Sequence, residues 1–162
     1  MAYQLGMNAK LYYEDGGYSP DAGAGNKPDI TTGVGTELSI VKDVTLNLEQ
    51  AEADVTTRGN NGWRATVGTL KEGSIETQIQ WDTANAAFNV ILAAWLNNTI
   101  IGIAALDTDY SATVSGTGLV SNFAVTNFTR NEALEEALVA DVTLKPTYSD
   151  VVPAWLSDGA FI

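Results

Sequence analysis

Most of the chain alternates apolar with polar residues, which is the two-residue period of a β-strand. The clearest example lies between 75 and 81, where Ile75, Ile79 and Trp81 share one face of the predicted strand. The opposite face is polar and mostly uncharged. It carries Glu76, Gln78 and Gln80.

The same period predicts further strands. One runs from about Leu5 to Tyr13, and another from Val44 to Val55. In the second, the apolar positions change from even to odd numbers near Glu49 and Gln50, which indicates a β-bulge. A Gly-Asn-Asn-Gly turn follows at 59–62. Strands are also predicted over 63–67, 100–106, 119–125 and 138–144, of which 100–106 is apolar on both faces and therefore central.

The period changes at Asp82, a plausible N-cap for a helix over 83–97. An apolar stripe is expected to face the core, at Phe88, Ile91, Leu92 and Trp95. The other face includes Ala86, Val90 and Ala93, and no charged residue occurs between Asp82 and Asp107. Because a surface helix usually carries charge outward, we expect this helix to be covered on both sides. About seven or eight strands around one helix predict a mainly β sandwich or barrel.

Two segments lack a strand pattern. Residues 14–35 contain almost no large aliphatic side chain, and no core strand is expected there. The candidate site residues of this segment are mostly glycines and prolines: Gly16, Gly17, Tyr18, Pro20, Gly25, Pro28 and Gly33. The second segment, a tail over 151–162, is apolar without alternation and includes Trp155 and Phe161. One small domain does not bury both of these segments and the uncharged helix, so we expect other subunits to contact them.

Composition narrows the possible functions. The 162 residues fit one domain, 1–162, and the net charge of -12 argues against a tight nucleic-acid ligand. Without Cys or His there is no disulfide, no Cys/His zinc site and no histidine-assisted nucleophile. We expect no enzyme, no cofactor and no bound metal. No secretory signal or long apolar run is present, so we expect synthesis in the cytoplasm and no membrane contact.

Several phrases of the sequence resemble the tail tube proteins of long-tailed bacteriophages. They are Val41 to Leu46, Glu52 to Arg58 leading to Gly62-Trp63-Arg64, the Trp81-Asp82-Thr83 junction, and Asn122-Phe123 through Asn127-Phe128 with Leu134-Glu135-Glu136. The resemblance covers nearly the whole chain and implies six-membered rings that stack into a hollow tube for DNA ejection. It places the protein in the virion tail, with the tape-measure, terminator and tip proteins as partners.

The resemblance also suggests roles for the residues named above. Residues 14–35 become an extended arm between rings, and Ala86, Val90, Ala93, Trp155 and Phe161 a subunit interface. Glu76, Gln78 and Gln80 become the lumen wall, past which DNA moves without specific binding. Two alternatives stay open: a tube protein of a contractile tail or secretion system, and a monomeric sandwich that binds sugar or protein through its aromatic residues. An enzyme is a distant third.

Overall fold

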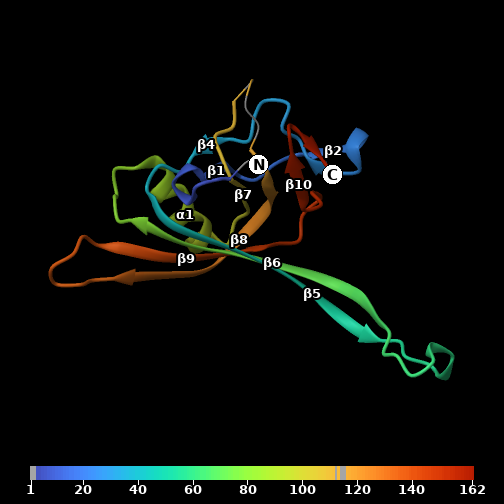
Figure 1. Ribbon diagram of the computed structural model, residues 1–162. Coiled ribbons are helices and arrows are strands. Elements are labelled where there is room, and N and C mark those ends of the chain that lie inside the picture. Colours follow the sequence, from blue (N-terminus) through green and yellow to red (C-terminus); the bar gives the residue numbers. More distant parts are fainter. Residues whose placement is uncertain (1–2, 112, 114–115) are drawn as a thin grey trace.

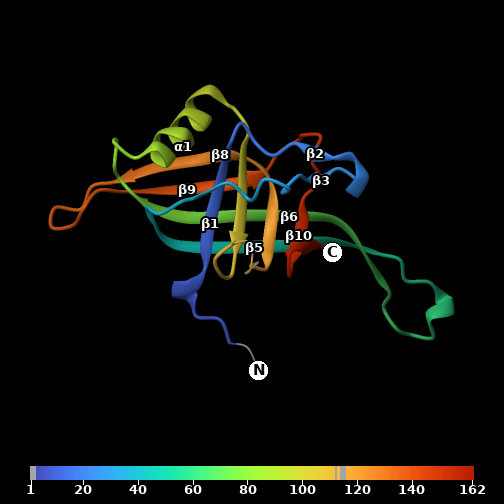
Figure 2. The ribbon, with the colours of Figure 1, turned by 90° about the horizontal axis from the view of Figure 1, so that it is seen from above.

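The computed structural model describes residues 3–111, 113 and 116–162. Its main sheet is antiparallel and has nine strands: seven follow the order β4-β1-β7-β8-β9-β6-β5, and the other two, β10 and β11, extend from β8, with β10 paired to β8 and β11 to β10. The sheet bends into two layers at β8 (Gly118–Asn131), since the first half of β8 pairs with β7 and the second half with β9. Figure 2 shows the strands of the two layers running across each other. The expected mainly β sandwich with one helix is confirmed.

The elements divide between the layers as follows. The first layer contains β4 (Thr36–Glu37), β1 (Lys10–Asp15), β7 (Ile101–Leu106), the first half of β8, β10 (Ala154–Ser157) and β11 (Ala160–Phe161). The second contains β5 (Val41–Asp54), β6 (Thr66–Gln80), β9 (Val139–Pro146) and the rest of β8. A small separate sheet pairs β2 (Pro20–Asp21) with β3 (Lys27–Pro28). Single 3-10 turns lie at Gly6–Asn8 (η1), Ala22–Ala24 (η2) and Arg58–Asn60 (η3).

The main core lies between the two layers and the helix α1 (Ala86–Asn97). The alternation between 75 and 81 is confirmed, because Ile75 and Ile79 are fully buried while Glu76 and Gln80 are exposed. Trp81, half-buried, stacks edge to face on Phe88 of the helix at 4.9 Å between ring centroids. The β-bulge predicted near Glu49 and Gln50 is present, as a register shift between Gln50 and Glu52 in β5.

A second core covers the other face of the first layer. Its buried members include Tyr12, Tyr18, Val34, Ala104, Leu106, Val120, Val151 and Leu156. Strand β7 separates the two cores, with Ile101 and Ile103 in the first and Ala104 and Leu106 in the second. The prediction of a central strand apolar on both faces is confirmed.

Residues 14–35 differ from the extended arm that was expected, because they fold back onto their own domain. Tyr18 is buried, its backbone N–H donates to Asn122 Oδ1 at 2.7 Å, and Asn122 Nδ2 donates back to the Tyr18 carbonyl at 3.1 Å. The Tyr18 hydroxyl donates to the Val34 carbonyl at 2.6 Å. Its ring lies so close to Gly102 that a Cβ there would approach it to 2.8 Å. The segment therefore contributes Tyr18 and Val34 to the second core, while residues 14–16, 19–20, 22–26 and 31–32 are exposed.

Three other boundaries need correction. The alternation at Leu5 and Met7 predicted a strand, but both side chains are exposed, η1 occupies Gly6–Asn8, and β1 begins at Lys10. The helix begins later than expected, since Asn85, and not Asp82, is the N-cap, accepting from the N–H groups of Ala87 and Phe88. The tail over 151–162 forms β10 and β11, which pair with β8 and with each other.

The helix is also rotated relative to the predicted stripe. Its buried face is Ala87, Phe88, Ile91 and Ala94, whereas Trp95 is exposed. The predicted Leu92 is half-buried and packs against the edge of the main core. The two buried alanines, Ala87 and Ala94, let the helix approach the sheet closely.

Candidate assembly surfaces

One face of the second layer is polar and is not covered by other parts of the chain that the structure describes. The ladder places Glu76 opposite Thr45 and Thr143, and Gln78 opposite Asp43 and Asp141. Side chains of directly opposite residues share a face. Gln78 donates to Asp141 at 3.0 Å across the strands. The three residues predicted for the lumen therefore lie together on one wet face, although their position in an assembly stays a prediction.

This polar face is acidic. Its acids are Asp43, Glu49, Glu72, Glu76 and Asp141, against the lysines Lys42 and Lys145. Hydroxyl and amide side chains, such as Thr45, Asn47, Thr129 and Asn131, occupy much of the rest. The face thus offers neither an apolar patch nor a basic track to a passing ligand.

The second layer has two open strand edges. Strand β5 is the last strand of the sheet and pairs only with β6 among the described residues. Strand β8 pairs with β7 only as far as Phe123, so its second half, 124–131, has β9 on one side and an open edge on the other. Open edges present unpaired N–H and C=O groups, which favour pairing with another chain. The two open edges, β5 and residues 124–131 of β8, therefore lie on opposite sides of the second layer.

The hairpin of β5 and β6 projects far from the body of the molecule (Figure 1). Beyond the bulge, Ala53 lies opposite Val67. The Val55 N–H donates to the Ala65 carbonyl at 2.9 Å, so the side chains of Ala53, Val55, Ala65 and Val67 form an apolar row. Val55 and Val67 are about half exposed, and Trp63 near the tip is 80% exposed. The strand predicted over 63–67 begins only at Thr66. Trp63 and Val67 stay exposed because no second layer lies under this part of the hairpin.

The residues predicted for the subunit interface are placed differently from one another. Ala86 and Ala93 are exposed on the outer face of α1, beside exposed Trp95 and Leu96, and this face carries no charge. Val90 is half-buried against the main core. Trp155 and Phe161, in β10 and β11, are half-buried against the main and second cores respectively.

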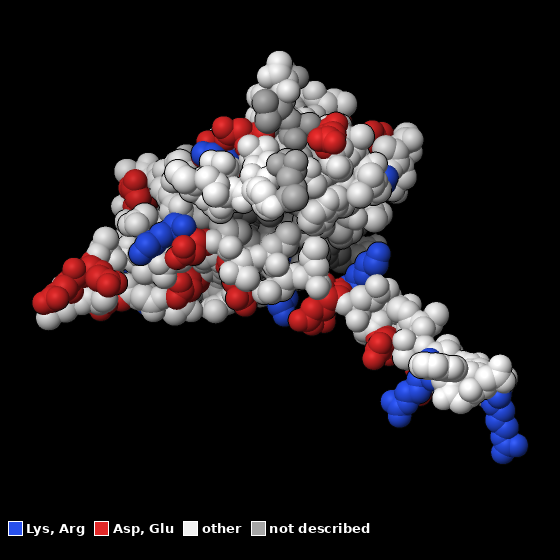
Figure 3. All heavy atoms as spheres, in the orientation of Figure 1, with Lys and Arg blue, Asp and Glu red and all other residues white. Residues whose placement is uncertain are grey.

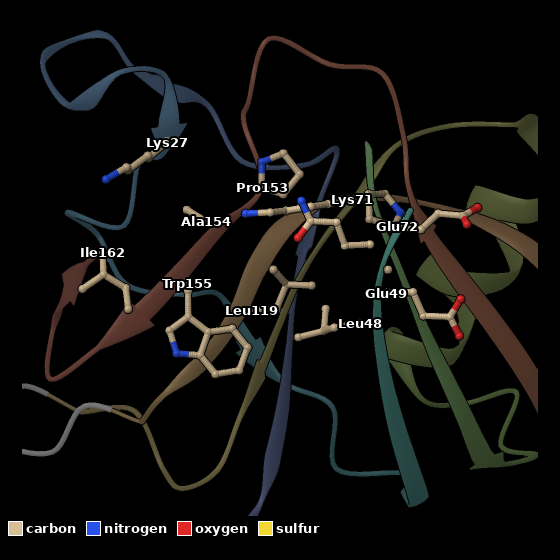
Figure 4. Close-up of a pocket in the computed structure, with 13 residues that line it drawn as sticks. Lys27, Leu48, Glu49, Lys71, Glu72, Leu119, Pro153, Ala154, Trp155 and Ile162 are labelled. Atoms are coloured by element: carbon tan, nitrogen blue, oxygen red, sulfur yellow. The ribbon is translucent and has the colours of Figure 1, made fainter. Parts of the chain in front are cut away.

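An apolar groove of about 550 Å³ opens at the base of the projecting hairpin (Figure 4). Leu48 of β5, Leu119 of β8, and Trp155 with Ile162 of the C-terminal segment form its floor. Lys27 and Lys71 stand at its edges, and Pro153 lies near Lys71. Glu49 and Glu72, which also line it, lie side by side at the β5 and β6 margin. Sequence reasoning missed this groove, because its residues come from separate segments of the chain, spread from Lys27 to Ile162.

Charge is unevenly distributed along the molecule. Figure 3 shows acidic side chains gathered at the end formed by the β8–β9 turn, and basic side chains at the tip of the β5–β6 hairpin. The turn contains Glu132, Glu135 and Glu136, and the hairpin tip Arg58 and Arg64. Arg130 pairs with Glu132 at 2.6 Å and lies 5.1 Å from the Trp81 ring centroid. Glu135 and Glu136 have no ion pair within residues 116–162 or the other described ranges.

The described residues form neither a metal-binding cluster nor a membrane-spanning helix. Residues 3–111, 113 and 116–162 contain no group of three or more acidic side chains placed to hold a metal ion. No helix in these ranges is long and apolar enough to cross a membrane. What the surfaces offer instead is open strand edges, an exposed hairpin and an apolar groove.

Neither protein-family models nor curated proteins match the sequence. Solved structures do match the fold. A chain from the tail of an empty gene transfer agent (GTA) particle, refined with C6 helical symmetry, superimposes with a TM-score of 0.68 at 12% identity, covering 96% of this chain and 100% of that one. The SPP1 tail tube gives a TM-score of 0.58 at 15% identity, covering 88% and 75%.

A third similar structure comes from the baseplate of the anti-feeding prophage, refined with six-fold symmetry. Its TM-score is 0.60 at 8% identity, and the match covers 99% of both chains. The three structures are described as a tail, a tail tube and a baseplate. At these sequence identities the similarity establishes the fold alone: the chain has the same fold as the GTA tail and SPP1 tail tube chains.

Proposed function

We propose that this chain is the major tube protein of a phage tail, a structural protein that forms six-membered rings and stacks them into a hollow tube for DNA. The observation that carries the proposal is the second layer, with its uncovered polar face between two open edges. The fold shared with tail-tube structures supports it.

Ring closure follows from the two edges. If the open edge of β5 in one subunit pairs with the open 124–131 edge of β8 in the next, six copies join their second layers into one closed barrel. A closed barrel leaves no exposed edge, which removes the aggregation hazard of the isolated sheet. The C6 symmetry reported for the similar GTA tail supports six as the number of subunits.

The polar face then lines the bore. Glu76, Gln78 and Gln80 would meet passing DNA with a wet, mildly acidic wall. Like charge repels phosphate, and the absence of an apolar or basic patch leaves DNA nothing to grip. The net charge of -12 fits a conduit better than a nucleic-acid binder.

The projecting hairpin would connect rings. Its apolar row at Ala53, Val55, Ala65 and Val67 and its exposed Trp63 have no cover in a free subunit, and a neighbouring ring would supply one. The inter-ring role predicted for residues 14–35 stays a prediction and is now limited to the exposed part of that segment. The uncharged outer face of α1, with Ala86 and Ala93, would contact another subunit.

The remaining elements of the proposal concern the particle. The tube would be made in the host cytoplasm, become part of the virion, enclose a tape-measure protein and end at terminator and tip proteins. A tube of a contractile or injection system is the second candidate, favoured by the likeness to the anti-feeding prophage baseplate. A monomeric aromatic binding module is less well supported, because Trp63 is the one strongly exposed tryptophan among the four.

Size-exclusion chromatography with light scattering, followed by negative-stain microscopy, tests the proposal. Six-fold rings or hollow tubes are the expected result. A stable 17.2 kDa species at every concentration, with affinity for glycans on an array, would favour the binding module instead.

A further inference from the structure

The groove at the base of the hairpin is an apolar surface without an occupant. Leu48 is half exposed and Ile162 largely exposed, although both border the half-buried Trp155. Exposed apolar side chains gathered in a concave site are typical of protein contacts. The groove lies beside the hairpin that extends toward the next ring, so a segment of another copy is within reach of it.

The charge at the groove limits what fits there. Lys27 and Lys71 are two of the eight basic residues of the chain. Neither forms an ion pair with any residue in the described ranges. The acidic Glu49 and Glu72 are directly opposite each other in the β5–β6 ladder and extend at one margin. A bound segment with one apolar side chain next to acidic ones would bury the apolar floor of the groove and form ion pairs with Lys27 and Lys71.

The β8–β9 turn of this same chain has that composition. Leu134 is fully exposed, and it is followed by Glu135 and Glu136, which lack partners among the described residues. The Glu136 N–H donates to the Ala133 carbonyl at 3.3 Å, so a tight turn holds Leu134 outward. Full exposure of a leucine side chain to water is unfavourable, so Leu134 would gain from being covered by another subunit.

The β8–β9 turn and the projecting hairpin lie toward opposite ends of the molecule (Figure 1). The groove is lined by Leu48 and Lys71 at the base of that hairpin, away from the turn. A turn cannot therefore reach its own groove. Copies stacked end to end, however, bring the turn of one copy to the groove of the next.

We propose that residues 132–136 of one copy dock in the groove of a copy in the adjacent ring. Leu134 contacts Leu48, Leu119 and Trp155, while Glu135 and Glu136 approach Lys27 and Lys71. The inference rests on the proposed function and names the second copy as the partner of this surface. It gives residues 14–35 a part in stacking through Lys27.

Cross-linking tests the contact directly, because the natural chain has no cysteine. Leu134→Cys combined with Leu48→Cys in one chain should, on mild oxidation of tubes, give a ladder of covalent oligomers on a non-reducing gel. Each single variant is the matched control and should stay monomeric on the gel. Pairing Leu48→Cys with Tyr3→Cys or Trp63→Cys probes two other exposed segments, and a ladder from either of these in place of the first would overturn the proposal.

Charge reversal provides a second test. Glu135→Lys with Glu136→Lys should leave rings but lose long tubes, and adding Lys27→Glu with Lys71→Glu should restore them. Asp15→Lys with Asp150→Lys changes net charge equally at two exposed positions and should leave tube length unchanged. Tubes of normal length from the first variant would refute the docking while leaving the tube function intact. If the natural chain forms neither rings nor tubes, the proposed function itself fails, and the docking fails with it.

Discussion

Replacing Asn122 by alanine should destabilise the subunit strongly through a single buried amide. The amide joins β8 to a residue 104 positions away, accepting from the Tyr18 N–H at 2.7 Å and donating to the Tyr18 carbonyl at 3.1 Å. It also donates to Ser149 Oγ at 3.3 Å. Asn122 and Tyr18 are both buried, so water cannot replace these bonds without opening the second core.

The magnitude follows from the groups left without partners. A buried donor or acceptor that loses its hydrogen bond costs about 1–3 kcal/mol. Asn122→Ala leaves both the N–H and the carbonyl of Tyr18 without a partner, so the free energy of unfolding should fall by about 2–6 kcal/mol. For a domain of this size, that loss lowers the Tm by roughly 4–24 °C.

Urea denaturation of the dilute subunit, followed by tryptophan fluorescence, measures the loss. Hydrogen exchange locates it, and the amides of residues 14–35 should lose protection before those of the main core. Asn127→Ala, an exposed change on the same strand, is the control and should stay within about 0.5 kcal/mol of the natural chain. A loss below about 0.5 kcal/mol for Asn122→Ala would refute the view that this amide anchors the segment.

Three further predictions concern pH and assembly. Burial raises the pKa of the Tyr18 phenol above its ordinary value of 10.0, so the stability from this neutral group is complete below that pH and declines above it; alkaline denaturation of Tyr18→Phe should show a shallower decline. Ala93→Glu, on the exposed helix face, should change the free energy of unfolding of the subunit by less than about 0.5 kcal/mol but reduce ring formation on size-exclusion chromatography. Rings formed normally by this variant would show that the exposed face of α1 is not a subunit contact. Glu76→Lys with Gln78→Lys should still assemble yet slow DNA ejection at low salt, with relief at high salt; a normal ejection rate at low salt would contradict their place in the bore.

The alternation of residues predicted much of the second layer. In β6, Ile75 and Ile79 had to share a face, and the polar residues between them had to share the other, because the side-chain period of a strand is fixed. The β5 bulge was predictable for the same reason, since an extra residue inverts the numbering of the apolar row. The pattern could not predict that the apolar row of Ala53, Val55, Ala65 and Val67 stays partly exposed, because alternation identifies the apolar face of a strand and not what packs on that face.

The second core escaped prediction because distant contacts create it. A glycine- and proline-rich segment has no period, and only Asn122, far along the chain, fixes where Tyr18 goes. Gly17 has a φ of 88°, and a Cβ at this position would approach Asn122 Oδ1 to 2.9 Å, so the contact between the segment and Asn122 requires glycine there. The strand β10 is only four residues long, too short for its alternation to stand out in the sequence.

A three-dimensional reconstruction of tubes assembled from the purified chain would test the central claim most directly. The account predicts a six-fold tube whose bore is lined by the polar face of β5, β6, β9 and the second half of β8, with Glu76 and Gln78 directed toward the axis. Strand β5 of each subunit should lie beside residues 124–131 of its neighbour in the ring. A tube that places this polar face on its outer surface, or a particle in which these two edges stay unpaired, would contradict it.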